Sequence, residues 1–497
     1  MALDQSVQQR FGSRLGLLLS ALGIAVGTGN IWRFPRIAAQ NGGDEGAGAL
    51  ILAWIIFLLL WSIPLIIAEY LIGRKYRYGV VGSFVKGIGK KFAWMGAFVA
   101  FVATAISFFY AIIVGWAMYY FFQTLLAPLP QTNEASLLIW ENFQNSSLPF
   151  FTHFGAVALG IFAIWKGIQS IEKINKVLIP VLIVIIFISV VRSLLLPGSL
   201  QGVTYLFTIE WAQLKTPEIW LQALTQNAWD TGAGWGLFLC YAAYMQARHG
   251  VVKNAFITGF GNNFISLIMA IMIFGTVFSL MQSGLGYTDQ EVLEVMQTSG
   301  PASTGLTFIW MPQLFNLMPG GRILAILFFL GLSFAGFSSL MSMLELTTRS
   351  LVDRGVKRNY AVLIIGLLVY LLGIPSAMSL NILSNQDFVW GLGLMLSGVF
   401  IAFFAIKFGI TELRTSAGGM ENDWSPGFWW ENTIRYFVPA AGIILLGWWL
   451  WLSFTEFAPQ QWYNPFVGFS PMTIALQWGV VLLLFVVFNK KIAKLAQ

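Results

Sequence analysis

The sequence predicts an all-α integral membrane protein with twelve membrane-crossing helices. Of its 497 residues, 57% are hydrophobic and only 10% are charged, whereas soluble domains average about 25% charged residues. The mean hydropathy is +0.75, and apolar runs long enough to cross a bilayer recur along the whole chain. A β-barrel would instead show short strands of alternating polarity. These observations exclude an ordinary soluble protein.

The apolar runs place the individual spans. A helix needs about 20 residues to cross the hydrocarbon. The third and eighth runs are longer than that, and the ninth is short. No connection is long enough for a soluble domain, so we expect one transmembrane domain over residues 1–497. The predicted spans are residues 15–39, 47–73, 92–125, 149–166, 176–196, 218–246, 254–282, 321–348, 360–374, 388–410, 434–455 and 471–489.

The charges of the connections alternate along the chain. By the positive-inside rule, both termini are predicted to be cytoplasmic, in a multi-pass protein of the cell membrane. The net charge of +7 then reflects topology, so the expected partner is the lipid bilayer and not nucleic acid. The basic connections are residues 10–14, 74–91, 166–176, 248–253, 349–358 and 490–494, and the acidic ones are 44–45, 134–141, 210–218, 289–294 and Glu456.

Two spans carry glycines and polar residues in their middle. "GIAVGTGNIWRFP" (23–35) interrupts the first span, and "NAWDTGAGWG" (227–236) interrupts the sixth. The two spans are five apart, so they cross in opposite directions. Paired interruptions of this kind indicate a transporter with inverted repeats. Close helix packing is the alternative, and the polar side chains in both stretches favour an unwound binding site.

An unwound segment frees backbone groups, which are costly in lipid. Freed carbonyl groups can coordinate a cation, and the positive N-terminal ends of half-helices can hold a carboxylate. The two interrupted spans therefore predict a site for a cation and an anionic group together.

Three segments of the chain resemble the neurotransmitter:sodium symporter family. They are "RLGLLLSALGIAVGTGNIWRFPRIAAQNGG" (14–43), "SFFYAIIVGW" (107–116) and "SFAGFSSLMSMLE" (333–345), which are similar to the family's first, third and eighth spans. The similarity follows the span order over nearly the whole chain. It implies sodium-driven import of amino acids or derived amines by alternating access, as in bacterial amino-acid transporters of the leucine-transporter type. We expect a small apolar or aromatic amino acid as the substrate, because Gly232 opens space in the pocket while Trp229 and Trp235 fill it.

The resemblance also implies the organisation of the chain. The fold would be the leucine-transporter 5+5 inverted repeat with broken helices 1 and 6. Its parts would be a cytoplasmic tail (1–14), repeat one (15–200), repeat two (218–410) and peripheral spans 11 and 12 (434–489). A monomer and a homodimer both stay open.

Two sodium sites follow from the resemblance, and hard cations of this kind prefer oxygen ligands. The first would use the carbonyl groups of Gly23, Val26 and Ala335 and the hydroxyls of Ser338 and Ser339. The second would use the Ala25 carbonyl, Asn30, Asp230 and Asn262. Asn263 is the competing candidate for the position of Asn262.

The substrate would lie beside the second sodium site. The amides of Thr28 and Gly29 and the hydroxyl of Tyr110 would meet its carboxylate. Some family members bind amines through an Asp at the position of Gly27, so Gly27 favours a free amino acid. The implied lining residues are Ala25, Thr28, Gly29, Ile106, Tyr110, Trp229, Gly232, Trp235, Ser339 and Met343.

Charged residues near the span ends resemble the family's gates. Arg33 and Asp387 would close the outer side. On the inner side, Arg10 would pair with Asp353 near Tyr244. Exposed ion pairs are worth only about 0–1 kcal/mol, which suits contacts that must open.

Asp230 departs from the family pattern, which has a Ser or Thr there. A helix-capping role is one interpretation. The other is charge balance, since Asp230 can supply the negative charge that chloride supplies elsewhere, and an intramembrane acid is usually functional. Ser266, four residues after Asn262, would alone suggest chloride dependence. We expect sodium as the coupling ion, two per cycle, and transport without chloride.

Other functions remain as alternatives. A channel would show flux without saturation, and a sodium-dependent carrier of an amino-acid-derived amine or osmolyte would share the fold. A sensor built on a transporter fold would bind without transporting, but the short tails disfavour it. An enzyme is not expected, because the sequence has no HExxH and no GxSxG motif.

Overall fold

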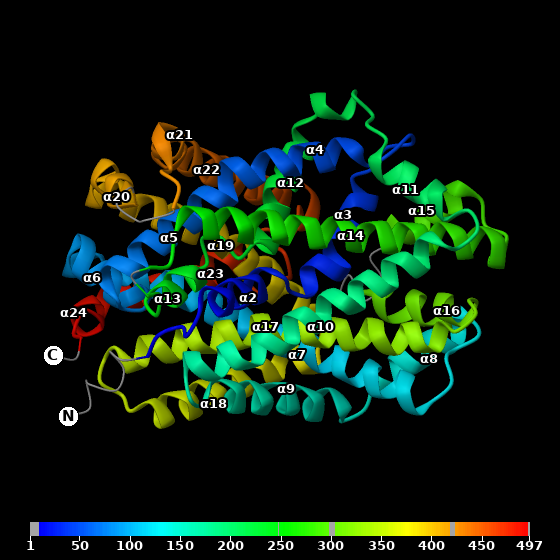
Figure 1. Ribbon diagram of the computed structural model, residues 1–497, viewed down its shortest axis with the longest axis horizontal. Coiled ribbons are helices and arrows are strands. Elements are labelled where there is room, and N and C mark those ends of the chain that lie inside the picture. The colour runs from blue at the N-terminus through cyan, green and yellow to red at the C-terminus, as the bar shows by residue number, and fades with distance from the viewer. Residues whose placement is uncertain (1–8, 247, 298–303, 418–422, 496–497) are drawn as a thin grey trace.

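The computed structural model describes residues 9–246, 248–297, 304–417 and 423–495, and within these ranges every regular element is a helix. Most long helices run in roughly the same direction and form one bundle (Figure 1). The helices α7 (Ala93–Leu126), α14 (Val252–Leu285) and α17 (Gly321–Val352) are the longest. The fold is the one that the sequence predicts.

Each predicted span has its helix. The first five spans are α2 (Arg14–Ala25) with η1 (Gly29–Arg33) and α3 (Phe34–Gln40), then α4 (Gly48–Phe57) with η2 (Leu58–Ser62) and α5 (Ile63–Tyr76), then α7, α9 (Leu148–Ile164) and α10 (Ile168–Leu194). The next five are α12 (Pro217–Asp230) with α13 (Leu237–Ala242), then α14, α17, α18 (Arg358–Met378) and α19 (Leu380–Phe408). The last two are α21 (Gly427–Asn432) with η7 (Thr433–Phe437), α22 (Val438–Leu452) and η8 (Ser453–Phe457), and then α23 (Pro471–Val487).

Length and composition support the count of spans. Eight helical stretches are long and apolar enough to cross a membrane by themselves. Two bent pairs of helices also qualify. The first pair is α2 with the continuous stretch η1–α3, and the second is α8 (Asn133–Gln144) with α9. The broken pair α12 and α13 and the shorter apolar α23 complete the twelve. The ninth span, predicted to be short, has 21 residues in α18.

Short helices cap the two ends of the bundle. One end holds α6 (Val80–Ile88), η3 (Lys90–Phe92), α20 (Ile410–Ala417) and α24 (Asn489–Ile492). The other holds α8, α11 (Ser199–Phe207), α15 (Asp289–Gln297), η6 (Leu306–Trp310) and α16 (Met311–Asn316) (Figure 1). The short segment η4 (Gln213–Lys215) precedes α12. We call the first end, which carries basic connections, the inner end and the second the outer end.

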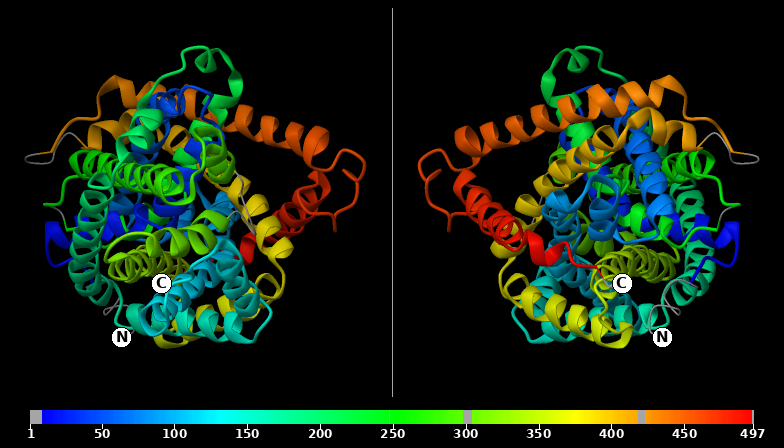
Figure 2. Two further views of the ribbon diagram at one scale, coloured as in Figure 1. Left: turned by 90° about the vertical axis from the view of Figure 1, so that its right-hand side faces the viewer. Right: turned by 90° about the vertical axis from the view of Figure 1, so that its left-hand side faces the viewer.

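The last two spans stand apart from the bundle. In Figure 2, α22 and α23 (orange and red) form a hairpin on the outside of the molecule. In the most apolar 18-residue stretch of Gly427–Phe457, 28% of the residues are buried. The corresponding share is 89% in the span that contains α7. Spans 11 and 12 are therefore peripheral, and α7 lies at the centre against α9, α17, α18 and α19.

The first span breaks where its glycines lie. Helix α2 begins at the N-cap Ser13, whose hydroxyl accepts a hydrogen bond from the Gly16 amide at 3.0 Å. It ends at Val26, whose backbone is extended (φ −79°, ψ 90°). The chain resumes helical structure at Gly29 with a bend of 52°. The half-helix ends of this span therefore lie inside the bundle.

The sixth span breaks over a run of alternate glycines. Gly232, Gly234 and Gly236 all have left-handed backbone conformations, with φ of 70°, 84° and 79°. A Cβ atom clashes with the backbone in the left-handed conformation, so only glycine adopts it at low cost. The result is an unwound stretch between the end of α12 at Asp230 and the start of α13 at Leu237.

Candidate substrate and sodium site

Side chains of the same span and of two other helices satisfy the backbone groups that the first break frees. The Gly27 amide donates to Asn30 Oδ1 at 2.8 Å, and the Thr28 amide donates to the Tyr110 hydroxyl oxygen at 3.1 Å. On the other side, the Ser339 hydroxyl lies 3.2 Å from the Gly23 carbonyl oxygen. The unwound backbone is thus held open by specific partners, which removes most of its cost in lipid.

Glu69 performs the same task at the second break. This residue of α5 is fully buried, and its carboxylate accepts hydrogen bonds from the amides of Gly234 at 2.6 Å and Leu239 at 3.1 Å. Glu69 is not among the site residues predicted from the sequence. Its signal is a lone acid within the apolar run "IPLIIAEYLIG", because an ionisable residue inside a membrane span is usually functional.

Three oxygen atoms from three helices converge between the two breaks. Asn262 Oδ1 lies 3.0 Å from the Ala25 carbonyl oxygen and 3.1 Å from the Asp230 carbonyl oxygen. All three are acceptors, so they repel one another unless a donor or a cation lies among them. Exchanging the oxygen and nitrogen of the Asn262 amide would place a donor in the cluster. However, the Asn262 NH₂ group would then lie 2.7 Å from the NH₂ group of Asn30, and two donors repel each other. The oxygen cluster has the donor set of a cation site.

The Asp230 side chain adds a carboxylate to this cluster. It is 5% exposed; its Oδ2 accepts a hydrogen bond from Gln226 at 3.4 Å, and its Oδ1 has no hydrogen-bond partner among the described residues. Asn30 Nδ2 donates to the oxygens of Asn262 and Ser266, each at 2.7 Å. The predicted residues Ala25, Asn30, Asp230 and Asn262 therefore lie together.

The residues predicted for the other sodium site also meet. The Ser339 hydroxyl of α17 reaches the carbonyl groups of Gly23 and Ile24 at 3.2 Å and 3.1 Å, and the Ser338 hydroxyl bonds the Ala335 carbonyl at 2.9 Å. Val26, at the end of α2, is fully buried. This group joins the first broken span to α17.

A cavity lies between the two breaks and α7. Nine of the ten residues predicted to bind substrate line it, and the exception is Ile106. Ile106 lies one helical turn before Tyr110 and is fully buried. Two other residues of the same helix, Phe109 and Ile113, line the cavity instead. The spacing of Ile113, three residues after Tyr110 on the same helix face, was an available signal, whereas no such spacing indicates Phe109. Gly27 lines the cavity as well, and Ile24, Trp32 and Leu237 are further lining residues that the sequence did not indicate.

The outer side of the cavity is closed by an ion pair and a tryptophan. Arg33 and Asp387 lie 4.0 Å apart, and the Arg33 guanidinium stacks 4.6 Å above the Trp229 ring. These three residues also line a larger cavity on the other side. They form a thin layer between the two cavities, which we call the outer closure.

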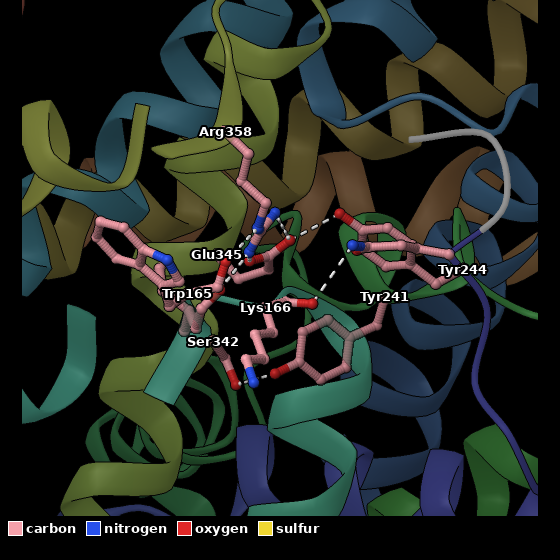
Figure 3. A network of polar contacts seen from close by, with 9 residues as sticks. Trp165, Lys166, Tyr241, Tyr244, Ser342, Glu345 and Arg358 are labelled. Carbon is pink, nitrogen blue, oxygen red and sulfur yellow. Dashed lines mark hydrogen bonds and ion pairs between the residues drawn. The ribbon is translucent and has the colours of Figure 1, made fainter. Parts of the chain in front are cut away.

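The inner end is closed by a buried polar network. The Tyr244 hydroxyl donates to Glu345 at 2.7 Å, and Arg358 pairs with the same carboxylate at 2.5 Å (Figure 3). Arg358 also donates to the carbonyl groups of Ile164 and Trp165, at the end of α9. The Glu345 side chain is fully buried. We call Tyr244, Glu345 and Arg358 the inner network.

The predicted pairing of Arg10 with Asp353 is not present. Asp353 pairs with Arg349 at 2.8 Å and accepts a hydrogen bond from the Gly79 amide at 2.6 Å. Arg349 lies one turn earlier on α17, so it reaches Asp353 without ordering another segment. Arg10 is exposed, whereas its neighbour Phe11 is fully buried and bonds the Tyr244 carbonyl through its amide at 3.1 Å.

The bundle has twelve spans, and two of them are broken around a central cavity with oxygen clusters. This architecture is typical of multi-pass secondary transporters. Comparisons with known proteins specify the class. The family profile "Sodium:neurotransmitter symporter family" matches residues 8–148 and 150–495. The chain therefore belongs to the sodium:neurotransmitter symporter family.

Individual relatives agree with this assignment. An uncharacterised sodium-dependent transporter of Methanocaldococcus jannaschii is 30% identical over 70% of each chain. The sodium-dependent transporter YhdH of Bacillus subtilis is 28% identical over 88% of this chain and 96% of its own length. The structure of MhsT in complex with L-phenylalanine superposes with a TM-score of 0.77 at 29% identity, covering 88% of this chain and 99% of MhsT.

Proposed function

We propose that the protein imports an apolar or aromatic amino acid together with sodium by alternating access, with both termini in the cytoplasm. The observation that carries the proposal is the oxygen cluster of Ala25, Asp230 and Asn262, in which one carbonyl oxygen from each broken span lies 3.0 or 3.1 Å from Asn262 Oδ1. A cation there would draw the two breaks together beside the cavity. This couples the ion to the substrate site.

The geometry at Tyr110 supports a carboxylate ligand. Its oxygen already accepts from the Thr28 amide at 3.1 Å, so the hydroxyl proton is left to donate into the cavity. A side chain at position 27 has little room, because a Cβ on Gly27 would lie 2.8 Å from the Tyr110 oxygen and 3.0 Å from Ser339 Oγ. An Asp for binding amines would not fit, which favours an amino acid over an amine.

The rest of the lining supports an apolar side chain on the substrate. The apolar side chains of Ile24, Phe109, Ile113, Leu237 and Met343 all line the cavity. The structural neighbour MhsT was solved with L-phenylalanine. We infer a substrate of that chemical class. The closures on both sides of the cavity, with Arg33 and Asp387 as the outer gate, support a carrier over a channel.

Uptake by proteoliposomes tests this function. Across a panel of amino acids, we expect saturable accumulation of apolar or aromatic ones when an inward sodium gradient is present, and none when potassium replaces sodium. Equal uptake without a sodium gradient would contradict sodium coupling. Flux that rises linearly with concentration would favour the channel alternative.

We also propose that Asp230 makes chloride unnecessary. Its carboxylate lies in the cluster that contains Asn30 and Asn262 and supplies a fixed negative charge there. Replacing chloride with gluconate should leave wild-type uptake unchanged. In Asp230→Ser, transport should become chloride-dependent through Ser266, and Asp230→Ser combined with Ser266→Ala is the matched control. Loss of wild-type uptake in gluconate would contradict the charge-balance role and favour a helix cap.

A further inference from the structure

Asn175 of α10 is a buried amide whose polar atoms are not paired. The residue is fully buried, and neither Oδ1 nor Nδ2 has a hydrogen-bond partner among the described residues. Most buried side-chain polar atoms are hydrogen-bonded, so an unpaired amide inside a membrane protein requires a physical explanation. An apolar residue of similar volume would pack there without that cost.

The position of this amide points to its role. A Cβ added to Gly23 would lie 3.2 Å from Asn175 Nδ2, 3.3 Å from Asn175 Oδ1 and 3.3 Å from Ser338 Cβ. The amide therefore lies directly against the α2 backbone at Gly23, beside Ser338. Gly23 and Ser338 belong to the proposed sodium site between α2 and α17.

We propose that Asn175 holds one water molecule that connects α10 to this sodium site, and that Asn175 thereby sets the sodium affinity. This inference rests on the proposed function. A buried water needs two to four polar partners, and the Asn175 amide, the Ser338 hydroxyl and the Gly23 carbonyl provide them. An amide both donates and accepts, so it can orient the water with its oxygen toward the ion, as a hard cation requires.

The sodium site then contacts three helices. α2 and α17 supply the direct oxygen ligands, and α10 supplies the water-bridged contact. Loss of the Asn175 amide would weaken sodium binding without altering the amino-acid cavity, because Asn175 does not line that cavity.

The test is equilibrium binding of radioactive sodium to the purified full-length protein. In Asn175→Ala, the half-saturating sodium concentration should rise roughly threefold to tenfold, as expected for the loss of one hydrogen bond between neutral groups. In Asn175→Asp, it should fall, because a negative charge is added beside the ion. A purely structural asparagine would not give opposite shifts in the two variants.

Asn254→Ala is the matched control. Asn254 is also fully buried and its Oδ1 is also unpaired, but it lies at the start of α14, where Nδ2 bonds the Gly250 carbonyl. Its truncation should leave the sodium dependence unchanged. Thermal stability in sodium-free buffer, measured for all variants, separates folding defects from ion binding.

The outcomes distinguish this inference from the proposed function. If the wild type binds no sodium, the proposed function fails and the inference fails with it. If the wild type binds sodium and both Asn175 variants keep the wild-type half-saturating concentration, only the inference is wrong. Opposite shifts in the two variants, with an unchanged Asn254→Ala control, support it.

Discussion

The two ends of the cavity are closed by contacts of different strength. At the outer closure, one ion pair of 4.0 Å joins Arg33 to Asp387, whose side chain is 40% exposed. At the inner network, Glu345 is fully buried and holds both Arg358 at 2.5 Å and Tyr244 at 2.7 Å. Exposed pairs are worth about 0–1 kcal/mol, whereas breaking a buried pair costs about 3–5 kcal/mol.

The difference in contact strength indicates which end of the cavity opens more easily. In the described conformation the inner end is held by several buried contacts, and the outer end is held by one partly exposed ion pair and by the stacking of Arg33 on Trp229. We infer that the outer side opens at low cost to admit substrate. Opening of the inner end costs more, because its contacts are buried, and under the proposed function sodium and substrate binding would supply that free energy.

The native cysteine allows the opening of the inner end to be measured. Cys240 is the only cysteine of the chain, and it is fully buried on α13, the inner half of the sixth span. Its reaction rate with N-ethylmaleimide reports opening of the inner end, and Cys240→Ala provides the background. No engineered reporter is required.

The largest effect is expected from Glu345→Ala. This variant leaves Arg358 and Tyr244 without their shared acceptor. Removing one partner of a buried ion pair costs about 3–5 kcal/mol, so the labelling rate of Cys240 should rise roughly a hundredfold. An unchanged rate would show that the inner network does not hold this end closed.

A smaller effect is expected from Tyr244→Phe. The variant removes a hydrogen bond to a carboxylate, worth about 1.5–3 kcal/mol, and labelling should rise roughly tenfold. Tyr241→Phe is the matched control, because Tyr241 lies three residues before Tyr244 and its hydroxyl bonds the neutral Ser342 at 2.7 Å. If Tyr241→Phe has the larger effect, the assignment of the network is incorrect.

The sequence predicted the broken spans, because the glycine positions are local features, whereas the residues of the central site were named from the family resemblance. It did not predict Glu69, since the partner of a freed amide depends on which helix packs against the break. It named Arg10 as the partner of Asp353 and did not anticipate Arg349. Two arginines compete for that carboxylate, and only their positions in the fold decide between them.

The smallest effect is expected from Asp387→Asn at the outer closure. Losing an exposed pair costs at most about 1 kcal/mol, so the dissociation rate of bound amino acid should rise by less than roughly fivefold. Arg33 still stacks on Trp229 in this variant. Labelling of Cys240 should not increase. An increase in Cys240 labelling would contradict the separation of the two ends.

The central claim is that both broken spans share one site for sodium and an amino acid. Equilibrium binding of radioactive L-phenylalanine to the purified protein, in sodium and in potassium, tests it most directly. We expect binding in sodium only, and a rise of roughly tenfold or more in the half-saturating sodium concentration in Asn262→Ala. Equal affinity in both salts would contradict the account.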